Sequence, residues 1–145
     1  MKYWDTSALV ALLVSEPATA GALALLQDDP VMVVSWTTAV ECASAVARAE
    51  RGHLLAAAEV SAAFARLDAL LLAWREVEPS TDQRDLARRL LRVHSLRSGD
   101  ALQLAAALLA AEHRPATLSV VTCDDRLKSA AQREGFNVVD PVDAG

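Results

Sequence analysis

Residues 1–13, MKYWDTSALVALL, lead from a short extended segment into an apolar one through a single acid, Asp5. The pattern predicts a strand over Lys2–Asp5 and a helix over Thr6–Val14. Aspartate is rare in strands and is only a moderate helix former, so a boundary suits it best. At this boundary Asp5 could cap the helix, or it could hold a ligand at the end of the strand.

The same alternation continues along the chain. We predict further strands at Val31–Val34, Trp74–Val77, Leu118–Thr122 and Phe136–Val139. Helices are predicted between them, at Pro17–Gln27, Ser35–Arg51, Leu54–Ala73, Ser80–Val93, Ser98–His113 and Asp124–Glu134. Strands that alternate with helices or helix pairs imply an α/β fold whose parallel sheet is covered on both faces. No linker or repeat interrupts residues 1–145, so we expect a single domain.

Composition excludes several classes of protein. Apolar residues make up 53% of the 145 residues, and no apolar run approaches the ~18 residues that span a bilayer. The N-terminus resembles a signal peptide, but Asp5 and Glu16-Pro17 argue against cleavage, and we expect a cytoplasmic protein. The net charge of −5 gives no indication of nucleic-acid binding.

Cysteine and histidine give no sign of a soft-metal site. Cys42 and Cys123 have no CxxC spacing, which suits a reducing compartment, and we expect both side chains to point into the core. The three histidines, His53, His94 and His113, lie far apart and match no zinc pattern.

Four acids lie where predicted elements meet: Asp5, Glu41, Asp100 and Asp124. Ligands of parallel sheets bind outside the carboxyl ends of the strands, so we expect these acids at one edge of the sheet. Two carboxylates about 4 Å apart repel by about 4 kcal/mol at an effective dielectric of 20. Such a cluster persists when a cation neutralises it or when protons are shared. Oxygen ligands alone favour Mg²⁺ or Mn²⁺, and four acids allow two ions for phosphodiester hydrolysis.

Each acid also has a purely structural explanation. Glu41 could complete a capping box with Thr38, and Asp5 could cap the first helix. Asp100 and Asp124 could simply favour the positive end of a helix dipole.

Neighbouring polar residues have the same two possibilities. Thr6 and Ser7 could hydrogen-bond a carboxylate, a bound water or a phosphate, or merely cap the helix. Thr122 should share the strand face of Asp124 and could support it. Asp125 is either a further member of the acidic group or, more simply, a solvated acid in the first turn of a helix.

Four blocks of the sequence, YWDTSALVALL, TTAVECASAVAR, LRSGDALQLAAAL and VVTCDDRLKSAAQREGFNVVDP, closely resemble the PIN-domain family, and best its VapC-type toxins. The similarity runs from Lys2 to Pro141. It implies a flavodoxin-like three-layer α/β/α sandwich with a central parallel sheet. It further implies an endoribonuclease that depends on Mg²⁺ or Mn²⁺, in which Asp5, Glu41, Asp100 and Asp124 are the catalytic and metal-binding acids. Thr6 and Thr122 match hydroxyl positions beside the first and last acid.

The resemblance also implies partners: an RNA substrate, a VapB-like antitoxin bound near the apolar Leu54–Ala73 helix, and a second copy of the chain in a homodimer. For RNA phosphates we expect contacts from basic residues that recur every four positions, with one more nearby: Arg84, Arg88, Arg92 and Arg97. The alternative is an ordinary solvated helix face, since Asp82 and Asp85 offset its charge.

The sequence leaves two other functions possible. A structure-specific DNA nuclease could use the same acids, because the metal chemistry cleaves either backbone. A catalytically silent α/β binding module is the second alternative, although a receiver-like site would need paired acids after the first strand, where Asp5 stands alone.

Overall fold

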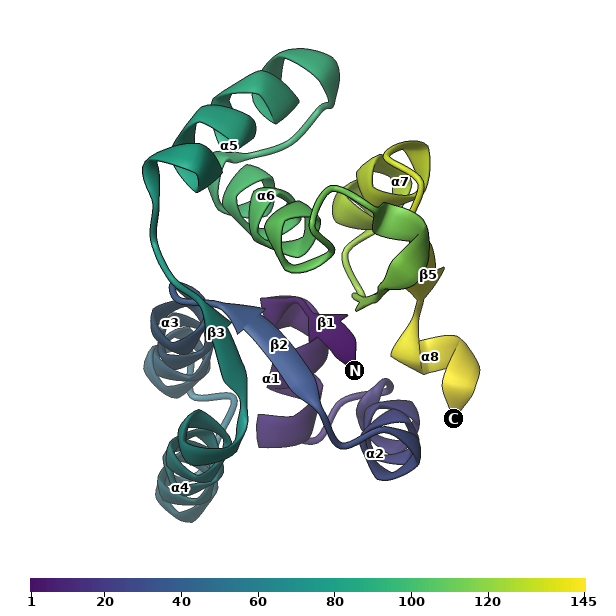
Figure 1. Cartoon of the computed structure of the whole chain (residues 1–145). Helices are drawn as coiled ribbons and strands as arrows, with labels where there is room; N and C mark the ends of the chain where they lie inside the picture. Colours follow the sequence, from purple (N-terminus) through teal and green to yellow (C-terminus); the bar gives the residue numbers. More distant parts are fainter.

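A computed structural model describes residues 1–145 as one parallel five-stranded sheet in the order β3-β2-β1-β4-β5. The strands are β1 (Lys2–Trp4), β2 (Met32–Ser35), β3 (Arg75–Val77), β4 (Ser119–Val121) and β5 (Asn137–Val139). The chain leaves β1 toward β2 and β3, then crosses to β4 on the other side of β1 (Figure 1). This reversal opens a crevice at the carboxyl ends of β1 and β4, where ligands of such sheets bind.

Helices cover both faces of the sheet (Figure 1). One layer contains α1 (Thr6–Leu13), α2 (Thr19–Asp28), α3 (Thr38–Arg51) and α4 (Ala57–Ala73). The other contains α5 (Thr81–Val93), α6 (Ser98–Ala110) and α7 (Asp125–Arg133). The predicted three-layer α/β/α sandwich is confirmed. None of these helices combines the length and apolar character needed to cross a membrane.

Alternation along the strands divides the apolar residues between two cores. Tyr3 and Val120 pack with α5–α7, whereas Trp4 and Val121 pack with α1–α4. Successive strand residues point to opposite faces, and here both faces are buried. The strands therefore read as continuous apolar runs, and each fully buried large side chain contributes roughly 1.5–3 kcal/mol.

Several boundaries differ from the sequence predictions. The third predicted helix begins at Thr38 rather than Ser35, because β2 includes Ser35 and the Trp36 N–H still donates to the Val77 carbonyl. The sixth ends at Ala110 rather than His113, which has a left-handed backbone with φ of 57°. The fourth begins at Ala57 rather than Leu54.

Two short elements were not predicted: a 3₁₀ turn, η1 (Pro115–Thr117), and α8 (Pro141–Ala144). Helix α8 returns the C-terminus onto α2. A β-carbon on Gly21 would lie 1.7 Å from the Pro141 carbonyl oxygen, so only glycine allows this close approach.

Candidate active site

A cleft of about 440 Å³ opens at the carboxyl edge of the sheet, and all four predicted acids line it. They come from four places far apart in sequence: the ends of β1 and β4 and the first turns of α3 and α6. The wall is completed by Thr6, Ser7, Val10, Glu16, Ala45, Arg48 and Cys123. The fold therefore brings Asp5, Glu41, Asp100 and Asp124 to one surface.

Asp5 is the most buried of the four acids, with 5% of its surface exposed. It precedes α1 and caps it, and its Oδ2 accepts three hydrogen bonds: from the Ser7 N–H (3.2 Å), the Ser7 hydroxyl (2.6 Å) and the Thr122 hydroxyl (3.0 Å). Burial raises the pKa of Asp5 from 3.8 to about 6, although these hydrogen bonds act in the opposite direction. The negative charge of Glu41 raises it further.

Glu41 is held by side chains rather than by the backbone. Its Oε2 accepts from the Thr6 hydroxyl at 3.0 Å, and its Oε1 accepts from Thr37 at 2.8 Å and from Gln103 at 3.2 Å. The capping box considered for Glu41 with Thr38 is wrong, because no backbone N–H donates to Glu41 and the Thr38 hydroxyl accepts from Gln103 instead.

Gln103 links the site to the core, and the sequence analysis missed it. It is buried in α6, and its Oε1 accepts from the Tyr3 hydroxyl at 2.6 Å while its Nε2 faces Thr6, Thr38 and Glu41. The amide orientation follows from the charge of Glu41, which requires a donor. The available signal was that Gln103 is the one polar residue of this helix after Asp100 and lies three positions after it.

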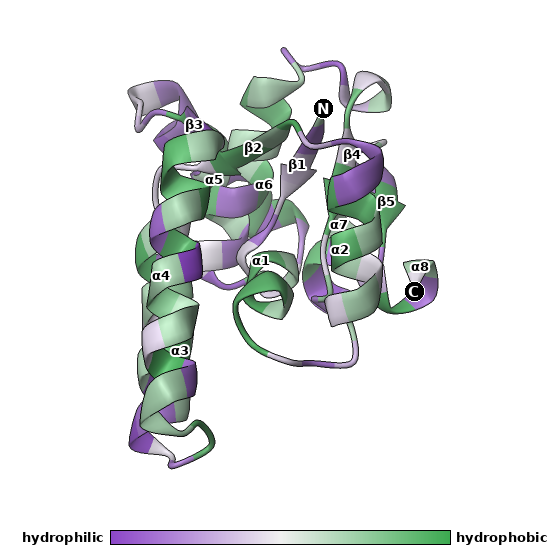
Figure 2. Ribbon diagram, turned by 90° about the horizontal axis from the view of Figure 1, so that it is seen from below, coloured by the Kyte–Doolittle hydropathy of each residue, from purple (hydrophilic) through white to green (hydrophobic).

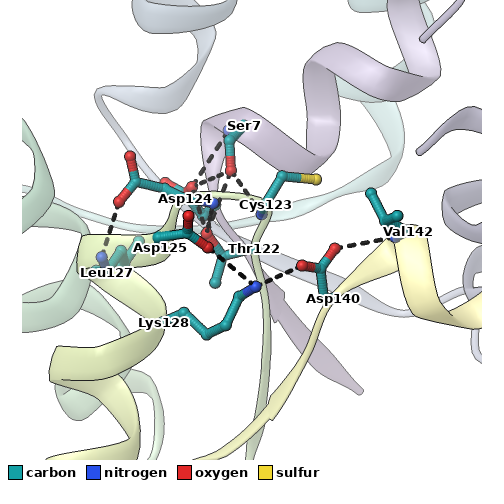
Figure 3. Close-up of polar contacts among 10 residues, drawn as sticks. Ser7, Thr122, Cys123, Asp124, Asp125, Leu127, Lys128, Asp140 and Val142 are labelled. Atoms are coloured by element: carbon teal, nitrogen blue, oxygen red, sulfur yellow. Dashed lines mark hydrogen bonds and ion pairs between the residues drawn. The ribbon is translucent and has the colours of Figure 1, made fainter. Parts of the chain in front are cut away.

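Asp100 and Asp124 act as helix caps and also line the cleft. Asp124 Oδ1 accepts from the Leu127 N–H at 2.8 Å at the start of α7 (Figure 3), and Asp100 Oδ2 accepts from the Arg97 N–H at 3.3 Å. Burial raises the pKa of Asp100, and the charge of Asp124 acts in the same direction. Arg97 and Arg126 oppose this shift. Asp100 and Asp124 therefore each cap a helix and also line the cleft, so the structural explanation does not exclude the functional one.

The three aspartates share a feature that bears on cation binding. Each caps a helix with one carboxylate oxygen and leaves the other, Oδ1 of Asp5 and Asp100 and Oδ2 of Asp124, without a hydrogen bond. No three acidic, histidine or cysteine side chains are placed to enclose a metal ion as they lie. The donor set nonetheless suits a hard divalent cation, since it consists of carboxylates with spare oxygens; side-chain rotation or intervening water would have to complete the coordination shell.

Ser7 connects the two strand ends that flank the crevice (Figure 3). Its hydroxyl donates to Asp5, accepts from the Cys123 N–H at 2.9 Å, and lies 3.2 Å from the Thr122 hydroxyl. Thr122 in turn accepts from the Asp124 N–H at 3.1 Å. Of the partners considered for Ser7, the structure shows a carboxylate, because Ser7 donates to Asp5; Thr122, predicted to support Asp124, also donates to Asp5 and contacts Asp124 only through its N–H. Together they fix Asp5 relative to the end of β4.

Asp125 and Cys123 differ in how far their side chains are exposed to solvent. The Asp125 side chain is 95% exposed and accepts from Lys128, which also bridges to Asp140 (Figure 3), as expected of a solvated acid in a first turn. Cys42 points into the core as predicted. Cys123 is half-buried: it packs against the core on the α1–α4 side of the sheet, as predicted, and it also lines the cleft.

The predicted basic residues do not gather in one place. Arg97 precedes α6 and lines a hollow together with Asp100 and Asp124. Arg84 lines a separate pocket with Trp36, while Arg88 and Arg92 are exposed on α5, where Arg88 lies 3.9 Å from an Asp85 oxygen. Of the four predicted contacts with RNA, the fold thus places Arg97 beside the acids.

Known proteins are similar to this chain in sequence and in fold. The family model described as PIN domain matches residues 2–133. Ribonuclease VapC45 of Mycobacterium tuberculosis is 33% identical over 136 residues, which is 94% of this chain and 92% of that protein.

Solved structures agree on the architecture. A toxin–antitoxin complex from Klebsiella pneumoniae contains a chain with a TM-score of 0.65 and 21% identity, covering 97% of this chain and 98% of that one. FitAB bound to an IR36 DNA fragment gives a TM-score of 0.70 at 18% identity, with coverage of 98% and 96%. Taken with the four acids at the sheet edge, these similarities show that the chain belongs to the PIN-domain family, among its VapC-type members.

Proposed function

We propose that this protein is an endoribonuclease that depends on a divalent cation, Mg²⁺ or Mn²⁺, and that it is the toxin of a toxin–antitoxin pair. The observation that carries the proposal is the cleft in which Asp5, Glu41, Asp100 and Asp124 meet from four separate elements. The relative with 33% identity is named a ribonuclease, and one similar fold comes from a toxin–antitoxin complex.

The chemistry follows from the charge of the cleft. A bound divalent cation would supply positive charge for the phosphate and lower the pKa of a water that attacks phosphorus. The spare oxygens of Asp5, Asp100 and Asp124 would hold that cation, and Glu41, fixed by Thr6 and Gln103, would orient the water. Before the cation binds, the four acids repel RNA, so this cleft acquires affinity for phosphate only when the cation is bound.

An apolar groove offers a place for the antitoxin. It has a volume of about 450 Å³ and lies between the end of α1, α2 and α4, with apolar residues along α1 and α4 (Figure 2). Its lining is mostly apolar, with Glu59 and Arg66 as its charged residues, and Leu23 is 47% exposed there. We propose that an apolar antitoxin segment binds in this groove, as amphipathic peptides do in other grooves. Homodimerisation and a cytoplasmic location remain predictions.

The test is cleavage of a mixed RNA pool by the purified protein. Cleavage is expected with Mg²⁺ or Mn²⁺, loss of cleavage with EDTA, and at least a hundredfold reduction for Asp5→Asn or Asp124→Asn. Asp68→Asn, on the exposed face of α4, is the matched control and should cleave normally. Cleavage of DNA but not RNA would favour the DNA nuclease, and no cleavage of either would leave a binding module.

A further inference from the structure

Two hollows continue the acidic cleft toward α7, and their charge changes along the way. The first, of about 430 Å³, shares Asp100, Cys123 and Asp124 with the cleft and adds Arg97, Asp125 and Arg126. The second, of about 290 Å³, shares Asp125 and Arg126 with the first. We call this second hollow the α7 pocket; its lining also includes His94, Ser95, Ser129, Ala130 and Arg133.

The α7 pocket carries more positive than negative charge. Arg126 and Arg133 are seven positions apart on α7, with Ser129 between them, so all three lie on one helix face. Neither arginine has an acidic partner within 4 Å, since every ion pair of the chain involves other groups. The one acid among the lining residues, Asp125, is 95% exposed and already pairs with Lys128.

The inner wall contains a buried polar atom without a partner. The His94 side chain is 4% exposed, and its Nε2 lies 2.8 Å from Glu134 Oε1. Its Nδ1 is buried and makes no hydrogen bond. Buried polar groups are nearly always paired, so this atom is an exception, but it has no accessible surface and is not counted among the donors of the pocket.

We propose that the α7 pocket binds a backbone phosphate of the RNA strand whose scissile phosphodiester lies in the acidic cleft, with the hollow of about 430 Å³ between the two sites. The proposal rests on the proposed function, because it assigns the path of the same substrate. Two guanidinium groups and two hydroxyls are the donors that proteins use for phosphate. The hollows share residues from one to the next, so one strand can occupy both. The pocket thereby supplies the affinity that an acidic cleft lacks.

Binding can be measured without turnover. The parent protein is Asp5→Asn in Mg²⁺, the probe is a fluorescein-labelled 12-nucleotide oligouridylate, and the readout is fluorescence anisotropy. Arg133→Gln and Arg126→Gln are each expected to weaken binding about tenfold and to lower the slope of log K against log salt by about 0.7, the value for one phosphate contact on a single strand. Arg75→Gln, at the start of β3 on the opposite edge of the sheet, removes the same charge and should have no effect.

Position is tested by replacing single phosphates of the probe with neutral methylphosphonates. One position should weaken binding to the parent about tenfold and weaken binding to Arg133→Gln clearly less, because this variant has already lost one of the two guanidinium groups that contact that phosphate. Thermal unfolding of each variant checks the fold, and Arg133→Lys, which keeps the charge but loses the bidentate geometry, should bind at an intermediate level.

Equal losses with Arg75→Gln, additive losses with the methylphosphonates, or no binding by the parent would overturn the proposal. Inorganic phosphate that shifts the His94 ring signals in the NMR spectrum but is not displaced by the probe would make the pocket a small-anion site and would overturn it as well. Cleavage of RNA by the wild type is scored separately. If the wild type cleaves RNA but the arginine substitutions do not weaken binding, the phosphate site in the α7 pocket is refuted and the proposed function is not.

Discussion

Replacement of Asp5 by Asn should stabilise the cation-free protein while it abolishes cleavage. Burial raises the pKa of Asp5 from 3.8 to about 6, so the folded state binds this proton more tightly than the unfolded chain does. The contribution of Asp5 to stability is therefore greatest below pH 4, falls as the pH rises to about 6, and stays reduced above it. Asparagine has no charge to desolvate, so the variant escapes this loss.

The pKa shift of Asp5 sets the size of the expected gain in the free energy of unfolding. About 1.36 kcal/mol per pKa unit gives roughly 3 kcal/mol as an upper bound at neutral pH. The hydrogen bonds of Asp5 survive the change, because all three converge on Oδ2, which the amide oxygen can replace as an acceptor. We therefore expect the free energy of unfolding to increase by about 1–3 kcal/mol at pH 7.5 and by almost nothing at pH 4.

The assay is urea unfolding followed by circular dichroism, from pH 4 to pH 8, with EDTA present throughout. Asp68→Asn is the control for loss of a charge without burial, and its curve should follow the wild type. Saturating Mg²⁺ should then stabilise the wild type more than Asp5→Asn, since only the folded wild type offers the full set of ligands. An Asn variant that is less stable than the wild type at pH 7.5, or a difference that does not change with pH, would refute this reasoning.

Three further substitutions test other parts of the structure. Gln103→Leu removes the shared partner of three hydroxyls and of the Glu41 carboxylate, so urea unfolding should show a loss of about 2 kcal/mol, and RNA cleavage should fall at least tenfold. Gly21→Ala should lower stability by roughly 1–3 kcal/mol through its clash with α8, whereas Gly99→Ala, where a β-carbon meets nothing within 4 Å, should be nearly neutral in the same assay. Leu23→Asp should weaken antitoxin binding at least tenfold by calorimetry, while Leu72→Asp, 92% exposed outside the groove, should not; equal losses would argue against the groove.

The sequence by itself determined the order of the elements, the parallel sheet and the position of the four acids. These features depend on local chemistry: apolar runs form buried strands and helices, and Asp5 or Asp124 is most favourable where a strand passes into a helix. The carboxyl ends of parallel strands share one edge, so the gathering of the acids followed from the topology alone.

Only the tertiary structure decided which side chains meet. Gln103 joins Tyr3 to Glu41 across about 60 to 100 residues of chain, and no local pattern reports such a contact. Arg126 and Arg133 line a pocket whose opposite wall comes from the segment before α6. A side chain's partners depend on how layers distant in sequence pack, and this packing is a property of the whole fold rather than of any segment.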